Sequence, residues 1–268
     1  MAGRPIKTLD RVLSKAGLGS RTDARSWIGA GRVTVNGVVI RTPDHWVDLE
    51  RDEVALDGAL VTQQERLYIL LYKPTGYITT YNDPDKRPTV YDLISDIRAW
   101  IAPVGRLDLD TSGLLILTND NQFADRVMSP ESKVPKTYLV KTNSLLDDEA
   151  LAKLRNGIEL SDGPTRPARV KRLRESASAT FLEITITEGR NRQVRRMIEA
   201  AGSRVRKLVR TSIGSISIGE LPIGKWRYLT KAEIDSLTGL RAKVSRPEPR
   251  DSKKTSSKRK GRPRSNPS

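Results

Sequence analysis

The chain has 268 residues, of which 48 are Lys or Arg and 32 are Asp or Glu, giving a formal net charge of +16 at pH 7. It contains no cysteine and only one histidine, His45, which excludes disulfides, thiolate zinc sites and cysteine nucleophiles. The positive charge predicts a polyanionic partner, with nucleic acid as the first candidate. No apolar run approaches the ~20 residues of a membrane span, and the N-terminus lacks a signal-peptide core. We therefore expect a cytoplasmic protein with no membrane partner.

The first 65 residues are expected to form a compact unit of two helices followed by hairpins. Apolar side chains from Leu9 to Ala16 recur at helical spacing. Ser20 is a candidate N-cap for a second helix, and Asp23 would complete its capping box. Asn36-Gly37 and Asp57-Gly58 each separate two apolar runs, which is the pattern of a tight β-hairpin.

Charge is unevenly distributed within this unit. Residues 1–41 contain eight Lys or Arg and two acidic residues, whereas residues 42–65 contain one and seven. Cations on or beside the two helices could hold a phosphate backbone, although they could also serve only as a soluble helix surface. The candidate RNA contacts are Arg11, Lys15, Arg21, Arg25 and Arg32.

Residues 66–237 are expected to form one α+β domain in which strands and helices alternate irregularly. We expect strands at 67–72, 76–80 (as the return of the first), 114–118, 138–140, 168–173 and 180–187. We expect helices at 89–94, 147–155 and 191–201, and a further helix that Asn119-Asp120 caps and that contains Phe123, Val127 and Met128. Residues 240–268 have eleven Lys or Arg against two acids and no aliphatic periodicity after Val244. This tail should be disordered and contact phosphates, so its removal should lower RNA affinity and leave the fold intact.

Two carboxylates in a glycine-bounded turn, Asp108 and Asp110, are the main candidates for chemistry. Three functions fit: a magnesium-dependent phosphotransferase, a calcium loop, or a metal-free nucleophile or base beside an arginine. The turn residues before Asp108 disfavour the first, which needs a hydrophobic strand there. No glutamate closes the loop as calcium requires. A purely structural Asx-turn remains an alternative.

A second cluster is strongly basic: residues 189–210 contain eight Lys or Arg and one acid. Such density could neutralise RNA phosphates or keep a nearby carboxylate ionised. A third element is Tyr138, which opens a strand after Lys136. Tyrosine at such a position usually packs in the core, but it could instead stack on a nucleobase.

In this order and spacing, the segments resemble the ribosomal-RNA pseudouridine synthases of the RsuA/RluB type. The matching segments are Gly105–Asp108 with Thr111–Leu115, Lys136–Tyr138, Gly189–Met197 and Gly224–Arg227. Residues 72–76 and 83–92 look closer to the large-subunit branch of that family. The resemblance covers about residues 8–237.

The resemblance implies an α+β fold in three parts. These are a small N-terminal alpha-L (S-four-type) RNA-binding domain at 6–65, a mixed, mainly antiparallel-sheet catalytic domain at 66–237, and the disordered basic tail at 240–268. It also implies isomerisation of uridine to pseudouridine in ribosomal RNA or a ribosomal assembly intermediate, by a monomer that needs no cofactor or metal. The alternative is a non-catalytic assembly protein that binds ribosomal RNA on the same scaffold.

The resemblance also assigns roles to residues. Asp108, and not Asp110, matches the catalytic aspartate, which attacks either the ribose or the uracil ring of a flipped uridine. Arg195 matches the arginine that pairs with this aspartate, with Arg192 as the other candidate. Tyr138 matches the tyrosine that packs on the target base and assists proton removal. Further RNA contacts are expected from Arg106, which would fill the gap left by the flipped base, and from Arg190, Arg192 and Arg196.

Overall fold

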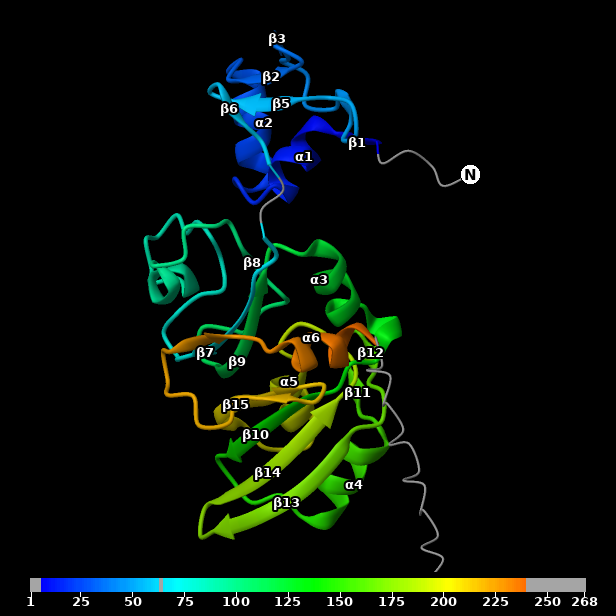
Figure 1. Cartoon of the computed structure of the whole chain (residues 1–268). Helices are drawn as coiled ribbons and strands as arrows, with labels where there is room; N and C mark the ends of the chain where they lie inside the picture. The colour runs from blue at the N-terminus through cyan, green and yellow to red at the C-terminus, as the bar shows by residue number, and fades with distance from the viewer. Residues whose placement is uncertain (1–5, 63–64, 240–268) are drawn as a thin grey trace, which may run out of the picture.

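The computed structural model describes residues 6–62 and 65–239 (Figure 1). The N-terminal residues form two helices and two small sheets, and the rest of the described chain is built on a nine-stranded sheet. The α+β class is therefore confirmed. The expected disordered tail at 240–268 lies outside the described residues, and the domain limits at 65 and 66 remain predictions.

The N-terminal unit has the expected local structure. Helices α1 (Leu9–Lys15) and α2 (Arg21–Gly29) pack together, and Ser20 with Asp23 forms the expected capping box at the start of α2. One sheet pairs β1 (Ile6–Thr8) with β4 (Trp46–Asp48). The other has the order β3-β2-β5-β6, with bounds Val38–Val39, Val33–Val35, Val54–Leu56 and Ala59–Leu60. At the first hairpin turn, Asn36 and Gly37 have φ of +52° and +78°, as a tight turn of this kind requires.

The large sheet has the strand order β13-β14-β10-β15-β9-β7-β17. The bounds in that order are Arg169–Ser176, Ala179–Ile186, Lys136–Thr142, Val205–Ile213, Ser112–Thr118, Tyr68–Lys73 and Trp226–Tyr228. Two short strands extend it: β8 (Ala102–Pro103) pairs with β9, and β16 (Ile216–Ser217) pairs with β15. Only the β15–β9 pair is parallel among the described strands. The sheet is thus mixed and mainly antiparallel, as expected.

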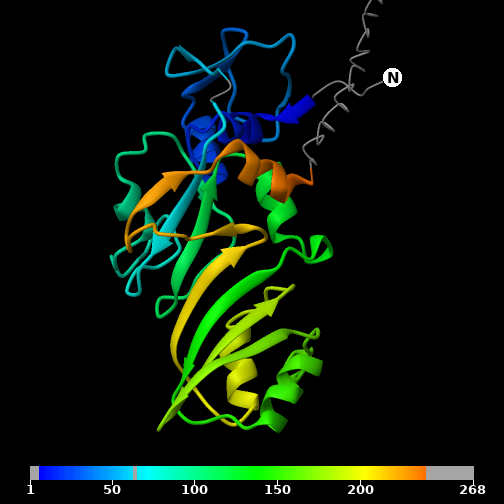
Figure 2. The same cartoon turned by 60° about the horizontal axis from the view of Figure 1, so that its bottom comes forward.

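Two pairs of helices pack on different parts of this sheet. Helices α4 (Asp148–Asn156) and α5 (Gln193–Ala200) lie on one side of β13, β14, β10 and β15 (Figures 1 and 2). Their Leu151, Leu154, Met197 and Ile198 share a buried cluster with the strands. Helices α3 (Asn121–Met128) and α6 (Lys231–Thr238) contact each other beside β7 and β9. Short elements complete the fold: 3-10 turns at Val90–Ile94 and Pro130–Ser132, and a hairpin of β11 (Glu159–Leu160) and β12 (Gly163–Pro164).

Two expectations about strands were wrong or incomplete. Residues 76–80 form no return strand, and Ile78 makes only an isolated bridge to Thr89. The physical reason is that both edges of β7 are already occupied, by β9 and by the late strand β17. The longest described strand, β15, was not predicted. Its cations interrupt the alternation of apolar and polar residues that predicts a strand, so the segment was interpreted only as part of the basic cluster.

Candidate active site

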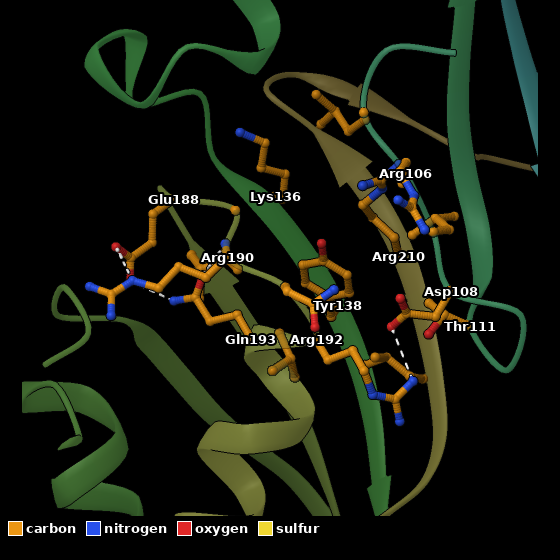
Figure 3. A pocket seen from close by; sticks show the side chains of 18 of the residues that line it. Arg106, Asp108, Thr111, Lys136, Tyr138, Glu188, Arg190, Arg192, Gln193 and Arg210 are labelled. Carbon is orange, nitrogen blue, oxygen red and sulfur yellow. Dashed lines mark hydrogen bonds and ion pairs between the residues drawn. The ribbon is translucent and has the colours of Figure 1, made fainter. Parts of the chain in front are cut away.

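A cavity of about 350 Å³ lies between the loop that carries Asp108 and the start of α5 (Figure 3). This volume is within the usual ~300–1,000 Å³ of ligand pockets. Of the residues predicted from sequence, it is lined by Arg106, Asp108, Tyr138, Arg190 and Arg192. Arg195 and Arg196, from α5, are not among its lining residues. The structure thus brings together three segments that are far apart in the chain.

The loop carrying Asp108 is held along its whole backbone. Each of the five carbonyls from Leu107 to Thr111 accepts a hydrogen bond from outside the loop. Lys73 Nζ donates to the carbonyls of Asp108 and Thr111, and Arg195 Nη2 donates to that of Asp110. Thr79 Oγ1 donates to the Leu107 carbonyl and the Gly76 amide to the Leu109 carbonyl. All five distances lie between 2.8 and 3.0 Å. The side chain of Asp108 is left 29% exposed and faces the pocket. Such fixation places a reacting carboxylate before substrate arrives.

Lys73 was not predicted as a site residue, although it ends the first strand of the domain. Its side chain is fully buried and donates to the carbonyls of Pro74, Asp108 and Thr111. Burial lowers the pKa of Lys73 to about 8, against the attraction of Asp108 and Asp110. Lysine is rarely buried this completely, and the sequence signal was the Lys73-Pro74 end of a buried strand.

The lowered pKa of Lys73 predicts a specific pH dependence of stability. The unfolded lysine titrates near 10.5, so the unfolded chain binds this proton more tightly than the folded chain. Burying the charge therefore costs stability at neutral pH, and that cost disappears as the pH rises from about 8 to 10.5. Relative to Lys73→Met, the free energy of unfolding of the wild-type chain should rise by up to about 3 kcal/mol across this window. Urea denaturation of both chains at about pH 7.5 and about pH 10 measures this, and a constant difference would contradict it.

The arginine that reaches Asp108 is Arg192. Its Nη1 lies 3.5 Å from Asp108 Oδ2 and 3.4 Å from Asp110 Oδ1. Arg195 instead donates to the carbonyl oxygen of Asp110 at 2.9 Å and pairs with the Asp110 carboxylate at 3.2 Å. The expected direct pair between Arg195 and Asp108 is therefore wrong here. Arg195 lies within α5 and contacts Asp110 and Thr111, whereas Arg192 precedes the helix and lines the pocket (Figure 3).

Backbone conformation directs Arg192 toward the loop. It is the N-cap of α5 and has a left-handed φ of +47°. This conformation is uncommon for a residue other than glycine, and such positions are concentrated at functional sites. The start of α5 thus presents the Arg192 guanidinium to Asp108.

The strand face beneath the pocket carries Tyr138, Lys136 and Arg210. A β-bulge between Thr137 and Tyr138 brings Arg210 opposite Tyr138, and bulges commonly redirect side chains in this way. Arg210 is 5% exposed; its Nε donates to the Leu114 carbonyl, and its buried Nη2 has no partner among the described residues.

Arg210 was missed because β15 was not predicted. Burial and the nearby Arg210 lower the pKa of Lys136. Neither cation has an acidic partner in the described parts of the chain. A ligand that brings negative charge would therefore be stabilised at this end of the pocket.

Two of the arginines expected to contact RNA, Arg190 just before α5 and Arg196 within it, already bind other groups of the protein. Arg190 donates to the carbonyls of Asp162, Gly163 and Pro164, and Arg196 forms a two-armed pair with the Asp162 carboxylate at 2.8 and 3.0 Å. They tie the β11–β12 hairpin to α5. Their role in RNA binding stays a prediction, and a phosphate would have to compete with these internal hydrogen bonds.

Three of the five N-terminal cations expected to contact RNA form ion pairs within the protein. Arg21 and Arg25 pair with the fully buried Asp10 at 2.8 and 3.0 Å. Although burial opposes ionisation, hydrogen bonds from Thr8 and the two arginines hold the pKa of Asp10 well below its usual value. Arg32 pairs with Asp57 at 2.6 Å. These three arginines remain about half exposed, and Arg11 is exposed on α1 beside the half-buried Lys15. Their role in RNA binding stays a prediction.

Two further properties concern metals and membranes. Within residues 6–62 and 65–239, no group of three or more His, Asp or Glu side chains could hold a metal ion. None of the helices in this part of the chain is long and apolar enough to cross a membrane.

Comparison with known proteins identifies the family. A model described as RNA pseudouridylate synthase matches residues 67–200, which contain Asp108, Tyr138 and the start of α5. A second model, the S4 domain, matches residues 7–54. The presence of the expected S-four-type RNA-binding domain at the N-terminus is thereby confirmed.

Similar proteins extend over most of the chain. An uncharacterized RNA pseudouridine synthase of Aquifex aeolicus is 43% identical over 230 residues, 85% of this chain and 92% of that protein. Ribosomal large subunit pseudouridine synthase B of Bacillus subtilis is 40% identical over 237 residues, 88% of this chain and 97% of that protein. A crystal structure of a pseudouridylate synthase superposes with a TM-score of 0.61 at 32% identity, over 86% of this chain and 99% of the other. The chain therefore belongs to the RNA pseudouridylate synthase family, enzymes that isomerise uridine to pseudouridine.

Proposed function

We propose that this chain converts uridine to pseudouridine in large-subunit ribosomal RNA, in the cytoplasm and as a monomer. The observation that carries the proposal is the pocket in which a fully clamped loop presents Asp108 to Tyr138 and Arg192. Relatives named for the large ribosomal subunit, at 38 to 40% identity, support this class of RNA. The S4 domain supplies RNA affinity outside the pocket.

In the proposed reaction, a uridine leaves its base stack and enters the pocket. The bond between N1 of uracil and C1′ of ribose breaks, and its electron pair passes to the uracil ring. After the ring turns, C5 bonds to C1′, the C5 hydrogen leaves as a proton, and N1 gains one. Asp108 attacks either C1′ of the ribose or the uracil ring. The bond it forms breaks again, as C5 bonds to C1′ in the first case or after that step in the second, and the free carboxylate is restored. Tyr138 packs on the base and assists removal of the C5 proton. Arg210 and Lys136 favour the negative charge that develops on the ring.

Arg106 is proposed to fill the space that the flipped base leaves. It is exposed at the pocket rim, and unstacking a base costs a few kcal/mol. We expect Arg106→Ala to lower kcat/KM by about 10- to 100-fold on a stem-loop with a stacked target. On an RNA whose target uridine is already unpaired, the loss should be several times smaller. Single-turnover rates on both RNAs test this, and equal losses would remove the proposed role.

A tritium-release assay tests the function itself. Because C5 loses its hydrogen when the carbon–carbon bond forms, RNA labelled with tritium at uridine C5 should release tritium to water. We expect release from immature large-subunit ribosomal RNA and none from a transcript of unrelated sequence. RNA binding without any release would favour the alternative of a non-catalytic assembly protein.

A further inference from the structure

The sheet that floors the pocket has a second face, on the side away from α4 and α5 (Figures 1 and 2). Strand register fixes which residues point there. Arg174, Phe181, Lys141 and Lys207 form one row across β13, β14, β10 and β15, and Lys171 lies in the next row. We call these five residues the outer face. Neighbouring strands are ~4.8 Å apart, so the row is about 14 Å long.

The outer face is open and basic. Lys171, Arg174 and Lys207 are exposed, and Lys141 and Phe181 are half-buried. The neighbouring Leu139 and Leu173 are also exposed, at 39% and 45%. Glu183 is the one acidic side chain in these two rows. In composition, this is a basic surface with apolar and aromatic side chains between the cations, as nucleic-acid-binding surfaces have.

The charges of the outer face are not neutralised by acidic side chains within the described part of the chain. Among the described residues, none of the four has an ion pair. By contrast Arg172, which points to the other face of the same strand, pairs with both Asp148 and Glu175. Arg174 instead lies over the Phe181 ring at 3.6 Å, with Lys141 at 5.2 Å from it. A guanidinium that lies over an aromatic ring can still donate hydrogen bonds to an incoming anion.

We propose that the outer face binds the phosphodiester backbone of RNA, as a second contact surface on the side of the sheet opposite the pocket. Charge complementarity favours RNA because four cations without an ion pair among the described residues lie beside one acid, Glu183. Because the two surfaces lie on opposite sides of the sheet, we expect a stem-loop just large enough to fill the pocket not to reach this face (Figures 1 and 2). The surface therefore selects for a large folded RNA over a minimal stem-loop. This conclusion rests on the proposed function for the identity of the RNA.

Matched lysine variants of the full chain test the proposal. One variant carries Lys141→Gln, Lys171→Gln and Lys207→Gln. The control carries Lys133→Gln, Lys225→Gln and Lys231→Gln, which also removes three lysine charges, all of them exposed and in the other half of the domain. Affinity is measured as a function of salt for a long ribosomal RNA fragment and for a short stem-loop. Three lost phosphate contacts should reduce the slope of log affinity against log salt by about 2 for the long fragment.

The expected result is a reduced slope for the outer-face variant on the long fragment only, with unchanged binding and turnover of the stem-loop. The control variant should change the slope on the long fragment by less than about 1. Equal slopes for the two variants would overturn the proposal. So would normal binding of naked RNA combined with lost binding to immature ribosomal particles, because that result assigns the face to an acidic protein surface. The salt dependence of RNA affinity is measured independently of turnover. A chain that made no pseudouridine would therefore refute the proposed function, whereas the slopes alone decide whether the outer face binds RNA.

Discussion

Replacing Asp108 with asparagine is expected to abolish pseudouridine formation while leaving RNA affinity within about twofold of the wild-type value. The substitution keeps the shape of the side chain and removes the nucleophilic, ionised oxygen. The loop should remain in place, because its five carbonyls are held by Lys73, Thr79, Gly76 and Arg195 through the backbone. The single-turnover rate should fall by at least about 10⁴-fold.

Asp110→Asn is the matched control for this experiment. Asp110 lies two residues away, is 49% exposed and pairs with Arg192 and Arg195. Its substitution weakens partly screened ion pairs at the rim and should slow the reaction by no more than about tenfold. Comparable losses in the two variants would contradict the assignment of Asp108 as the reacting carboxylate.

Gly113→Ala is expected to be the most destabilising single-methyl substitution near the site. Gly113 has a φ of +122°, which side chains rarely tolerate. It faces Arg210 across the parallel β9–β15 pair, and an added Cβ would meet the Arg210 backbone within 3 Å. Rigid backbone on both strands leaves no side chain to move aside. We expect a loss of about 3–5 kcal/mol in the free energy of unfolding, together with loss of activity as Arg210 is displaced.

Gly189→Ala provides the comparison for stability. Gly189 also lies at the pocket, but a Cβ added there would meet no atom within 4 Å, and its φ is not positive. Its substitution should change the free energy of unfolding by less than about 1 kcal/mol. Denaturant unfolding curves of both variants measure the difference. A Gly113→Ala chain as stable as Gly189→Ala would show that β9 and β15 can separate without cost.

Local features of this fold could be predicted from sequence because their causes are local. The capping box of Ser20 and Asp23 and the turn at Asn36-Gly37 depend on residues within a few positions of each other. The loop carrying Asp108 was found for the same reason, since its glycines and carboxylates are contiguous. The resemblance to a family then separated Asp108 from Asp110, which local chemistry alone had left open.

The parts that could not be predicted depend on residues distant in the chain. Only the assembled sheet shows that Lys73 passes beneath the loop and that Asp162 occupies Arg190 and Arg196. Which arginine, Arg192 or Arg195, pairs with Asp108 depends on where α5 begins. The left-handed conformation of its N-cap, Arg192, cannot be recognised from the amino-acid sequence. The sequence therefore shows how many cations lie around α5, but not which of them already bind other groups of the protein.

Mapping pseudouridine in ribosomal RNA from cells with and without this chain tests the central claim most directly. We predict at least one position in large-subunit ribosomal RNA that is pseudouridine when the wild-type chain is present. That position should be uridine when the chain is absent or replaced by Asp108→Asn. Identical maps in all three cases would contradict the claim that this pocket isomerises uridine in ribosomal RNA.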